Sequence, residues 1–562
     1  MAFQVSPGVA IREIDLTNVV PAVSTSIGAT VIAGVKGAIE EIVTVTSEKE
    51  LVDQFGVPNA DTAAYFFNAA AFLKYGNNLK VVRVAGSGAK NATAGTTGAG
   101  VGLLIKNRDH YDANYGGGEA SDGAFAARHA GTLGNSITVS VVTNSTAYGI
   151  WDYADQFDSA PSTSAYTTNK GGSADEMHIV VIDQNGLVSG VEGTILEKFA
   201  YVSQASDARK SDGTTNYYKE VINATSNYIW WLDHPAGLTN AGQTAGRTFT
   251  TLNTVFEKDL AGGANGAAID EGDIDTGFQV FNDAETVDVN LLFGAPTLDG
   301  EAGETQAANL LAIAENRKDL IAFVSPPVSA TATSTTPKED VIAFADTLTA
   351  TSYGFMDSTA LKIYDKYNDV YRWIPACGHM AGLCANTDNV ADAWFSPGGF
   401  TRGQLLGVTK LAFNPKRAER DDLYKKRVNP IVSFPGEGTV LFGDKTLLTK
   451  PSAFDRINVR RLFIVLQKAI STAAKYQLFE LNDEFTRAMF RNMTEPFLRE
   501  IQGRRGITDF RVVCDETNNT GEIIDSNQFV ADIYIKPARS INFITLNFIA
   551  TRTGVDFAEI GG

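Results

Sequence analysis

The sequence predicts a multidomain protein of mixed α+β and α/β architecture. Its 562 residues exceed what one hydrophobic core supports, and at roughly 100–200 residues per domain they indicate about three to five domains. The 52 glycines favour many turns and strands over long helical bundles. Between residues 29 and 85, helix-start signals alternate with apolar strand-like runs, which is the pattern of a sheet covered by helices.

The helices of this first α/β segment are predicted from their boundary residues. The stretch "ATVIAGVKGAIEEIVTVTS" predicts two strands, and "SEKELVDQFG" predicts a helix with Ser47 as N-cap and Gly56 beyond its last turn. A second helix is predicted in "DTAAYFFNAAAFLKYG", capped by Asp61, and "NLKVVRVA" predicts the next strand. The resulting β-α-α-β order indicates an α/β unit.

A different pattern begins at residue 86. Small, polar, Gly-rich stretches separate short strands such as "SITVSVVT" and "MHIVVIDQNG", and strand signals dominate to about residue 195. A long flexible loop is the alternative, but the alternating strands favour a folded β insertion. After residue 195 the α/β pattern returns. A long helix is predicted at about 456–480, then shorter helices to Gly503 and three final strands.

Charge is unevenly distributed along the chain. The net charge is −18, yet residues 401–562 hold 24 basic against 19 acidic residues, whereas residues 1–400 hold 23 against 46. Such asymmetry suggests solvent around one part and an acidic partner for the other, and drift in surface composition is the alternative. The acidic total argues against a general nucleic-acid binder. The sequence contains no apolar run of about 18 residues and no signal-peptide pattern, so we expect no membrane insertion.

The stretch "FPGEGTVLFGDKT" at 434–446 comes close to the phosphate-binding pattern G-x-x-x-x-G-K-[ST]. Asp444 stands between Gly443 and Lys445, which shifts the lysine by one residue and places a negative charge where phosphates would lie. The glycines also precede the apolar "TVLF", whereas a phosphate loop follows a strand and leads into a helix. We therefore interpret 438–446 as a turn that leads into a buried strand, and keep a soluble enzyme as the less favoured alternative.

Catalytic, cofactor and metal motifs are not recognisable in the sequence. Cys377, His379 and Cys384 in "ACGHMAGLC" lack a usual zinc spacing and a nearby fourth ligand. There is no G-x-S-x-G nucleophile motif, no H-E-x-x-H and no calcium loop. We expect no catalytic residue, no cofactor, no metal and no enzymatic activity. Three scattered cysteines are too few for a disulfide framework, which favours synthesis in a reducing compartment.

A basic stripe is predicted on the long helix. In "DRINVRRLFIVLQKAISTAAKYQLFE" the apolar residues repeat with helical spacing, and Arg461, Lys468 and Lys475 recur every seven residues, which keeps them on one face. A solvated face on an ordinary helix is the alternative. The functional hypothesis is a basic ridge that faces an acidic surface.

Several stretches resemble, in order, the tail sheath protein of long contractile-tailed bacteriophages. "SPGVAIREIDLT" is similar to the family's N-terminal arm, "FGVPNADTAAYFFNAAAFLKYGNNLKVVRV" to its helix-and-strand segment, and "GTLGNSI" to its glycine turn. Further similar stretches are "PACGHMAGLCANTD", "RVNPIVSFPGEGTVLFGDKTL", "NVRRLFIVLQKAI" and "ITLNFIATRTGVDFAEI". Asn386 departs from the arginine expected before Thr387, and the resemblance does not extend to residues 97–190 or to much of 235–300.

The resemblance implies a virion structural protein rather than an enzyme. Sheath subunits form hexameric rings in a helical polymer around the inner tail tube, in a metastable extended state, and contract to drive the tube through the host envelope without nucleotide hydrolysis. The implied partners are other copies, the inner tail tube protein, and baseplate and tail terminator proteins, with no direct nucleic-acid contact. The implied location is the phage tail, and the host cytoplasm during assembly. The sheath of a related contractile injection or secretion system is the alternative.

The resemblance also implies a division into domains. It assigns an N-terminal arm (1–20), a discontinuous middle α/β domain (21–96 and 191–375), a β-rich outer insertion (97–190), a C-terminal sheath domain (376–540) and a C-terminal strand (541–562). In the family, both arms are strands lent to the C-terminal domain of neighbouring subunits. The apolar residues expected to make this exchange are Val9, Ile11, Ile14, Leu16, Leu546, Phe548, Val555 and Phe557. The basic stripe then has a target, the inner tube, with Arg460, Arg461, Lys468 and Lys475 as the tube-facing set.

Overall fold

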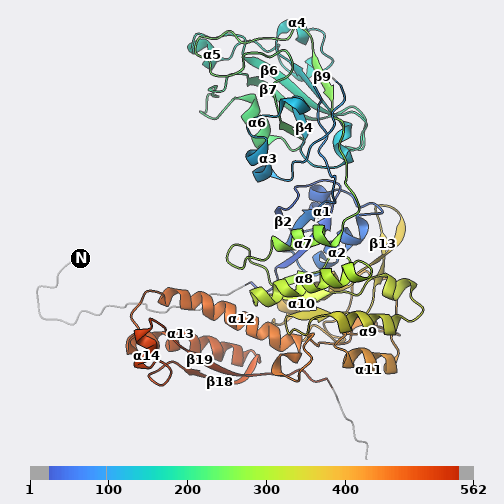
Figure 1. The fold of residues 1–562 in the computed structure, drawn as a ribbon, viewed down its shortest axis with the longest axis vertical. Coiled ribbons are helices and arrows are strands. Elements are labelled where there is room, and N and C mark those ends of the chain that lie inside the picture. The colour runs from blue at the N-terminus through green and yellow to red at the C-terminus, as the bar shows by residue number, and fades with distance from the viewer. Residues whose placement is uncertain (1–23, 97, 543–562) are drawn as a thin grey trace, which may run out of the picture. The chain divides into compact units, whose positions relative to one another are not determined.

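The computed structural model describes residues 24–96 and 98–542. The chain forms two compact units (Figure 1). The larger comprises Ser24–Ala391 and Pro397–Asp455, and the smaller comprises Asp392–Ser396 and the described part of Arg456–Gly562. Both units mix helices and strands, in agreement with an α+β multidomain fold. Among the described residues, no helix has the combined length and apolarity that crossing a membrane requires.

A six-stranded sheet organises the larger unit, in the order β12-β11-β10-β1-β3-β2. Its strands are β1 (Gly28–Ala33), β2 (Ile42–Val45), β3 (Leu79–Val84), β10 (Leu291–Phe293), β11 (Ile321–Val324) and β12 (Gly354–Met356). Neighbouring strands are parallel, except that β2 runs antiparallel to β3. Every residue of β1 is buried. A parallel strand covered on both faces reads as a continuous apolar run, which explains why "GATVIA" shows no alternation.

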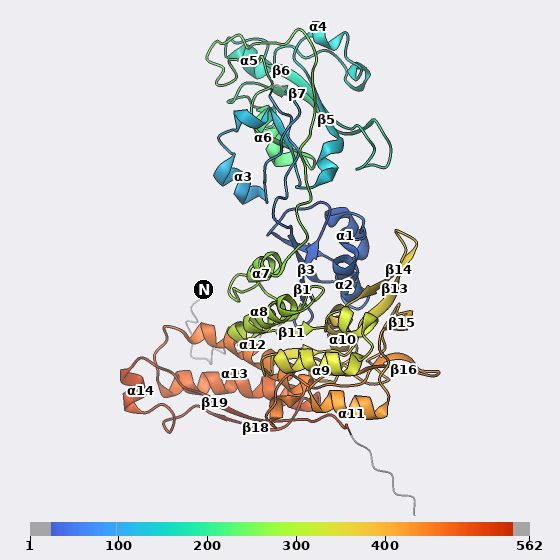
Figure 2. The ribbon, with the colours of Figure 1, turned by 45° about the vertical axis from the view of Figure 1, so that its right-hand side comes forward.

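Helices cover both faces of this sheet (Figure 2). On one face α2 (Ala63–Leu73) packs against α10 (Cys377–Val390), and on the other α7 (Glu271–Gln279) packs against α8 (Glu301–Arg317). Glycine permits the close approach of α2 and α10, because a Cβ on Gly378 would lie 2.1 Å from the backbone oxygen of Asn68. The remaining helices of this part are α1 (Glu48–Phe55), α9 (Pro337–Thr347) and α11 (Arg417–Lys425).

The two predicted helix starts near the N-terminus have different outcomes. For α1 the prediction is confirmed: the Ser47 side chain accepts from the backbone N–H of Glu50, and Gly56 follows the last residue. For α2 the predicted cap at Asp61 is wrong, because the helix begins at Ala63. The Asn59 side chain instead accepts from the N–H groups of Asp61 and Thr62. Asn, like Asp, favours such turns.

A β-rich insertion follows β3. Its four-stranded antiparallel sheet has the order β7-β6-β5-β9, and a second pair joins β4 to β8. The strands are β4 (Phe125–Ala127), β5 (Ile137–Val142), β6 (Glu176–Asp183), β7 (Thr194–Ser203), β8 (Ile229–Trp231) and β9 (Phe256–Asp259). The helices are α3 (Arg108–Asn114), α4 (Ser145–Tyr148), α5 (Ala165–Asn169) and α6 (Tyr218–Thr225).

The insertion is longer than the predicted range of 97–190. Ala92 already contributes to its core and Leu260 still does, so the prediction that 191–259 belongs to the middle α/β domain is wrong. The stretch "YKEVINAT" forms α6, but helical periodicity does not say which core a helix covers. Tyr218 and Ile222 of α6 pack into the insertion core.

The predicted C-terminal domain, by contrast, begins too early at residue 376. Helix α10 packs on the central sheet, and residues 397–455 also belong to the larger unit. They include parts of two small antiparallel sheets, β14-β13-β15 and β16-β17. The strands are β13 (Leu361–Asp365), β14 (Val370–Ile374), β15 (Lys410–Leu411), β16 (Ile431–Phe434) and β17 (Gly438–Leu441). The boundary therefore lies at Arg456, apart from the short segment Asp392–Ser396.

The smaller unit packs an antiparallel strand pair against helices. Its elements are α12 (Ile457–Ala474), α13 (Glu484–Gly503), α14 (Gly521–Asp525), β18 (Ile507–Val513) and β19 (Asp532–Pro537). Helix α12 ends before the predicted residue 480, and a 3-10 turn, Lys475–Gln477, follows it. The predicted strands at β18 and β19 are confirmed. The third strand is predicted from Ile541 onward, and all but its first two residues lie outside the described residues.

Arg83 in β3 ties the insertion to the central sheet. Its guanidinium is 2% exposed and donates to the backbone oxygens of Gly34 at 2.9 Å, Gly37 at 2.7 Å and Ala130 at 2.8 Å. Burial lowers its pKa to about 10. Gly34 and Gly37 follow β1, whereas Ala130 belongs to the insertion. One side chain therefore satisfies three carbonyl groups from two parts of the chain.

We predict that Arg83→Met lowers the free energy of unfolding of the larger unit by about 2–4 kcal/mol, because three carbonyls lose a charged donor. Arg83→Lys is not expected to restore it, since an ammonium group cannot reproduce the planar fork. Thermal unfolding followed by circular dichroism measures the change. Lys49→Met, on the exposed side of α1, is the control. A melting temperature of Arg83→Met equal to that of the wild type contradicts the prediction.

Candidate assembly surfaces

The glycine-rich stretch at 434–446 forms the turn and second strand of the β16–β17 hairpin. Phe434 pairs with Gly438, and the strand β17 follows the glycines as predicted. The Lys445 ammonium donates to the backbone oxygen of Tyr424 at 2.7 Å and lies 4.2 Å from the centre of its ring. The Tyr424 hydroxyl donates to Asp444, which is 3% exposed. These groups make internal contacts that hold the hairpin to α11.

The cysteines and histidine of α10 lie inside the larger unit. The Cys377 sulfur is 3.4 Å from Asn68 Oδ1, and His379 Nδ1 is 3.0 Å from the Tyr75 hydroxyl. Burial raises the pKa of Cys377 to about 12 and lowers that of His379 to about 3. Cys384 is buried in the same helix. Within residues 24–96 and 98–542, no cluster of three or more His, Cys, Asp or Glu could hold a metal ion. These side chains contribute to helix packing.

A polar junction joins β11 and β12 to the start of α10. The Ser325 hydroxyl donates to Asp357 at 2.5 Å and accepts from the backbone N–H groups of Ala376 and Cys377 at 3.0 and 2.9 Å. Asp357 is fully buried, and burial raises its pKa to about 7. The carboxyl group therefore changes protonation state near neutral pH inside the core.

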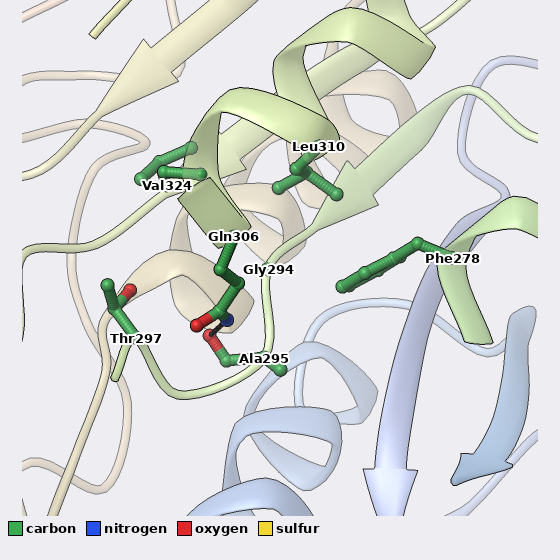
Figure 3. A pocket seen from close by; sticks show the side chains of 8 residues that line it. Phe278, Gly294, Ala295, Thr297, Gln306, Leu310 and Val324 are labelled. Atoms are coloured by element: carbon green, nitrogen blue, oxygen red, sulfur yellow. Dashed lines mark hydrogen bonds between the residues drawn. The ribbon is translucent and has the colours of Figure 1, made fainter. Parts of the chain in front are cut away.

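A small cavity lies between α8 and the ends of β10 and β11 (Figure 3). Phe278, Leu310 and Val324 form its apolar wall. The Gln306 side chain is occupied by backbone, because its amide nitrogen donates to the oxygens of Ala295 and Pro296 and its oxygen accepts from the N–H of Leu298. The cavity has room for at most about one water molecule. Sites for organic ligands are much larger, roughly 300–1,000 Å³.

The predicted basic ridge is divided between buried and exposed positions. Arg460 and Arg461 are 7% and 3% exposed, Lys468 is half-buried, and Lys475 is exposed just after the end of α12. The expectation that all four lie on one accessible surface is therefore wrong. Long basic side chains can bury their stems along apolar neighbours, which sequence spacing does not reveal. Contact of Lys468 and Lys475 with a tube stays a prediction.

The predicted arm residues cannot be compared with the structure. Val9, Ile11, Ile14, Leu16, Leu546, Phe548, Val555 and Phe557 lie outside the described residues. The smaller unit contains the antiparallel pair β18 and β19, each with one strand neighbour in the described part of the chain. Its inner face packs against α12 and α13 through Phe510, Val512, Ile533 and Ile535.

Sequence reasoning missed an exposed apolar tip between α12 and α13, at residues 476–485. Its large apolar residues, all more than half exposed, are Tyr476, Leu478, Phe479, Leu481 and Phe485. Polar residues hold the loop: the Asn482 amide donates to the backbone oxygen of Gln528 at 2.8 Å, and Arg487 donates to Asn482 Oδ1 at 2.9 Å. The tip was missed because the helix was predicted to continue to residue 480.

An aromatic cluster lies on the surface of the larger unit. The rings of Phe400, Phe434 and Phe442 have centroids 5.3–5.9 Å apart, and Phe400 and Phe442 are 52% and 42% exposed. The Arg420 guanidinium lies 5.7 and 5.8 Å from the ring centres of Phe434 and Phe442. Adjacent exposed aromatic rings are uncommon on a monomer surface and indicate an interaction site.

Three family models match the chain. The phage tail sheath protein central domain matches residues 267–447, the phage tail sheath C-terminal domain matches 449–551, and the domain III N-terminal region of the tail sheath protein Gp18 matches 25–84. The junction between the first two lies close to the boundary between the two structural units. The matches also lie on both sides of the β-rich insertion.

Whole proteins show the same similarity. The crystal structure of a sheath tail protein from Listeria innocua has a TM-score of 0.55 at 13% identity, over 92% of this chain and 93% of that one. The anti-feeding prophage helical sheath in its contracted state has a TM-score of 0.51 at 13% identity, over 98% and 100%. At such identities these likenesses show the fold alone, which is that of contractile sheath proteins.

Sequence identity defines the family more narrowly. The tail sheath protein of Vibrio phage KVP40 is 35% identical over 99% of each chain. The chain therefore belongs to the phage tail sheath protein family, and the resemblance seen in the sequence is confirmed. Membership implies a component of the virion tail.

The buried carboxyl of Asp357 predicts a specific pH dependence of stability. Its pKa in the folded state is raised from 3.8 to about 7, so the fold retains a proton that the unfolded chain releases. Asp357 therefore destabilises the fold increasingly as the pH rises from about 4 to about 7, and constantly above that. We expect Asp357→Asn to gain about 2–3 kcal/mol relative to the wild type between pH 5 and pH 8.

Denaturant unfolding at several pH values measures this difference. The wild-type profile also contains the opposite effect of buried histidines such as His379, whose pKa is lowered, so the difference between variant and wild type is the quantity to compare. Asp61→Asn, at an exposed position, is the control. Parallel stability profiles for Asp357→Asn and wild type would show that the carboxyl does not titrate in this range.

Proposed function

We propose that this chain is the structural subunit of a contractile phage tail sheath. It polymerises as six-fold helical rings around the inner tail tube, in a metastable extended state, and contracts to drive the tube through the host cell envelope. Similarity to a tail sheath protein over 99% of both chains is the observation that carries the proposal. Assembly takes place in the host cytoplasm, and baseplate and tail terminator proteins bind the two ends of the polymer.

Contraction without nucleotide hydrolysis requires that the polymer itself stores free energy. Two packings of one lattice, separated by a barrier, meet this need, and the extended form is then stable for kinetic reasons. The Gly438 hairpin fits a scaffold role, because Lys445 and Tyr424 bind each other there. We infer that the protein is not an enzyme and uses no cofactor.

Strand exchange supplies the links that survive contraction. An isolated two-stranded sheet is marginal, and open edges with unpaired N–H and C=O groups invite further strands. The β18–β19 pair offers such edges, and the apolar arms at 1–20 and 541–562 supply strands of suitable composition. Backbone hydrogen bonds of this kind hold neighbours together while the units reorient. A head-to-tail exchange continues into a helical polymer rather than closing as a dimer.

Negative-stain microscopy of the purified full-length chain tests the function. We expect rings or hollow tubes without added nucleotide, and no nucleotide turnover. Deletion of residues 1–20 is expected to abolish polymer while the melting temperature of the larger unit stays unchanged, because the arm serves a neighbour. Leu187→Ser with Val191→Ser, at exposed apolar positions of the insertion, is the control. Polymers of normal length from the arm-deleted chain would contradict strand exchange.

Tube contact is proposed for Lys468 and Lys475. Exposed ion pairs contribute about 0–1 kcal/mol each, which suits a surface that must release at contraction. We expect Lys468→Glu with Lys475→Glu to reduce sheath assembly on isolated tubes about tenfold at low salt, since two reversed pairs are enough for such a change. Arg460 and Arg461 are left unchanged because their burial would confound the test.

The control for this test is Lys170→Glu with Lys210→Glu in the insertion, which makes the same change of charge. Sedimentation of sheath with tubes, followed by gel densitometry, gives the bound fraction. Equal co-sedimentation of both double variants would show that the two lysines do not contact the tube.

The sheath of a related contractile injection system is the second candidate. The fold likeness to the anti-feeding prophage sheath, over 98% of this chain, favours it. Whether the polymer copurifies with a DNA-filled capsid separates the two, because only a phage tail carries one.

A further inference from the structure

We propose that the apolar tip of one copy docks on the aromatic cluster of another copy. The apolar tip is residues 476–485 in the smaller unit, and the aromatic cluster is Phe400, Phe434 and Phe442 in the larger unit. This contact rests on the proposed function, because it joins copies of a polymer. It is separate from strand exchange, since neither surface belongs to β18, β19 or the arms.

The tip exposes apolar side chains and partly buries a polar one, the reverse of an ordinary surface loop. Its polar Asn482 is half-buried and anchored to the backbone of Gln528, whereas the ring of Phe479 is fully exposed. Phe479 also has φ +71°, a left-handed conformation that a bulky residue rarely adopts. Below the loop, Ala473 and Phe490 already belong to a packed core, which leaves the tip residues outside it. A loop held in this way presents apolar side chains to a partner.

The ring geometry of the aromatic cluster suits contact with such side chains. Its three rings meet edge to face or tilted, at interplanar angles of 55–64°. Tilted rings leave aromatic faces and edges accessible, and contacts with further aromatic rings contribute about 0.5–1.5 kcal/mol beyond burial. The Arg420 guanidinium borders the rings, an arrangement that is frequent in the most strongly contributing parts of protein interfaces.

Charge complementarity identifies a second copy as the occupant. The tip carries three exposed acids, Glu480, Asp483 and Glu484, next to one exposed base, Lys475. The cluster is bordered by α11, where Arg417 and Arg420 are three residues apart and so share a face, and Lys416 precedes them.

On α11, at its two ends and in the β16–β17 turn, the bases outnumber the acids by five to four: the bases are Lys416, Arg417, Arg420, Lys425 and Lys426, and the acids are Glu419, Asp421, Asp422 and Glu437. An acidic apolar tip and a basic aromatic surface therefore match each other in both polarity and sign. Because the two surfaces are different, one copy can use both at once, toward two neighbours, and the contact propagates head to tail.

Cross-linking between copies tests the contact directly. One preparation of the full chain carries Phe479→Cys and a second carries Phe442→Cys, and the two are mixed, polymerised and oxidised. The native cysteines Cys377, Cys384 and Cys514 are buried, so the introduced thiols react selectively. We expect covalent dimers at least about tenfold above those formed when Leu187→Cys, an exposed apolar position in the insertion, replaces Phe479→Cys.

Charge reversal provides a second, independent test. Glu480→Arg with Glu484→Arg, and separately Arg417→Glu with Arg420→Glu, are each expected to raise the concentration needed for polymer formation about tenfold. Combining the four changes is expected to restore it to within about threefold. Glu192→Arg with Asp212→Arg, at exposed acids of the insertion, is the matched control. Circular dichroism confirms that each variant is folded.

The outcomes separate this inference from the proposed function. If the wild-type chain forms no polymer, the proposed function fails. If the wild type polymerises but the cysteine pair cross-links no better than the Leu187→Cys control, or the four changes restore nothing, the contact is wrong. If Phe479→Ser polymerises normally alone but no longer assembles on tubes, the tip binds the tube instead, which also overturns the proposal.

Discussion

The larger unit depends on the close packing of α2 against α10 over the parallel sheet. Asn68 of α2 makes it possible, because its amide donates to the oxygen of Gly294 after β10 while its oxygen accepts from the N–H of Gly378 in α10. Without a Cβ at Gly378 the helices approach closely enough for these bonds. Ser325 adds the matching bonds to the first N–H groups of α10. These bonds satisfy the carbonyl after β10 and the N–H groups at the start of the helix.

This rigid packing has consequences for assembly. A unit with a closely packed core can move as one body, so in the proposed polymer contraction is carried by links between copies rather than by refolding. In the proposed polymer such links come from the edges of β18 and β19, the exposed apolar tip and the aromatic cluster. On the proposed function, the free energy stored in the lattice resides in these contacts between copies rather than in the cores of the subunits.

Local signals in the sequence predicted much of the fold. Ser47 and Gly56 bounded α1, and the order of glycines before "TVLF" correctly predicted a turn that leads into a strand at Gly438. The prediction that Asp61 caps α2 was wrong because Asn59, two residues earlier, makes the turn. Domain limits were less predictable. Helix α6 has the same periodicity whether it covers the central sheet or the insertion, and only its contacts decide.

The sequence by itself determined the family, the element types and the unequal distribution of charge, because these depend on local residue pattern and order. The tertiary structure alone decided which charged and apolar side chains are accessible. Arg461 and Lys475 share a predicted helix face, yet one is buried and the other exposed. Phe479 is a large apolar residue of the kind that usually lies in a core, yet its side chain is fully exposed. Accessibility depends on which distant segments cover a residue, and spacing along a helix carries no information about them.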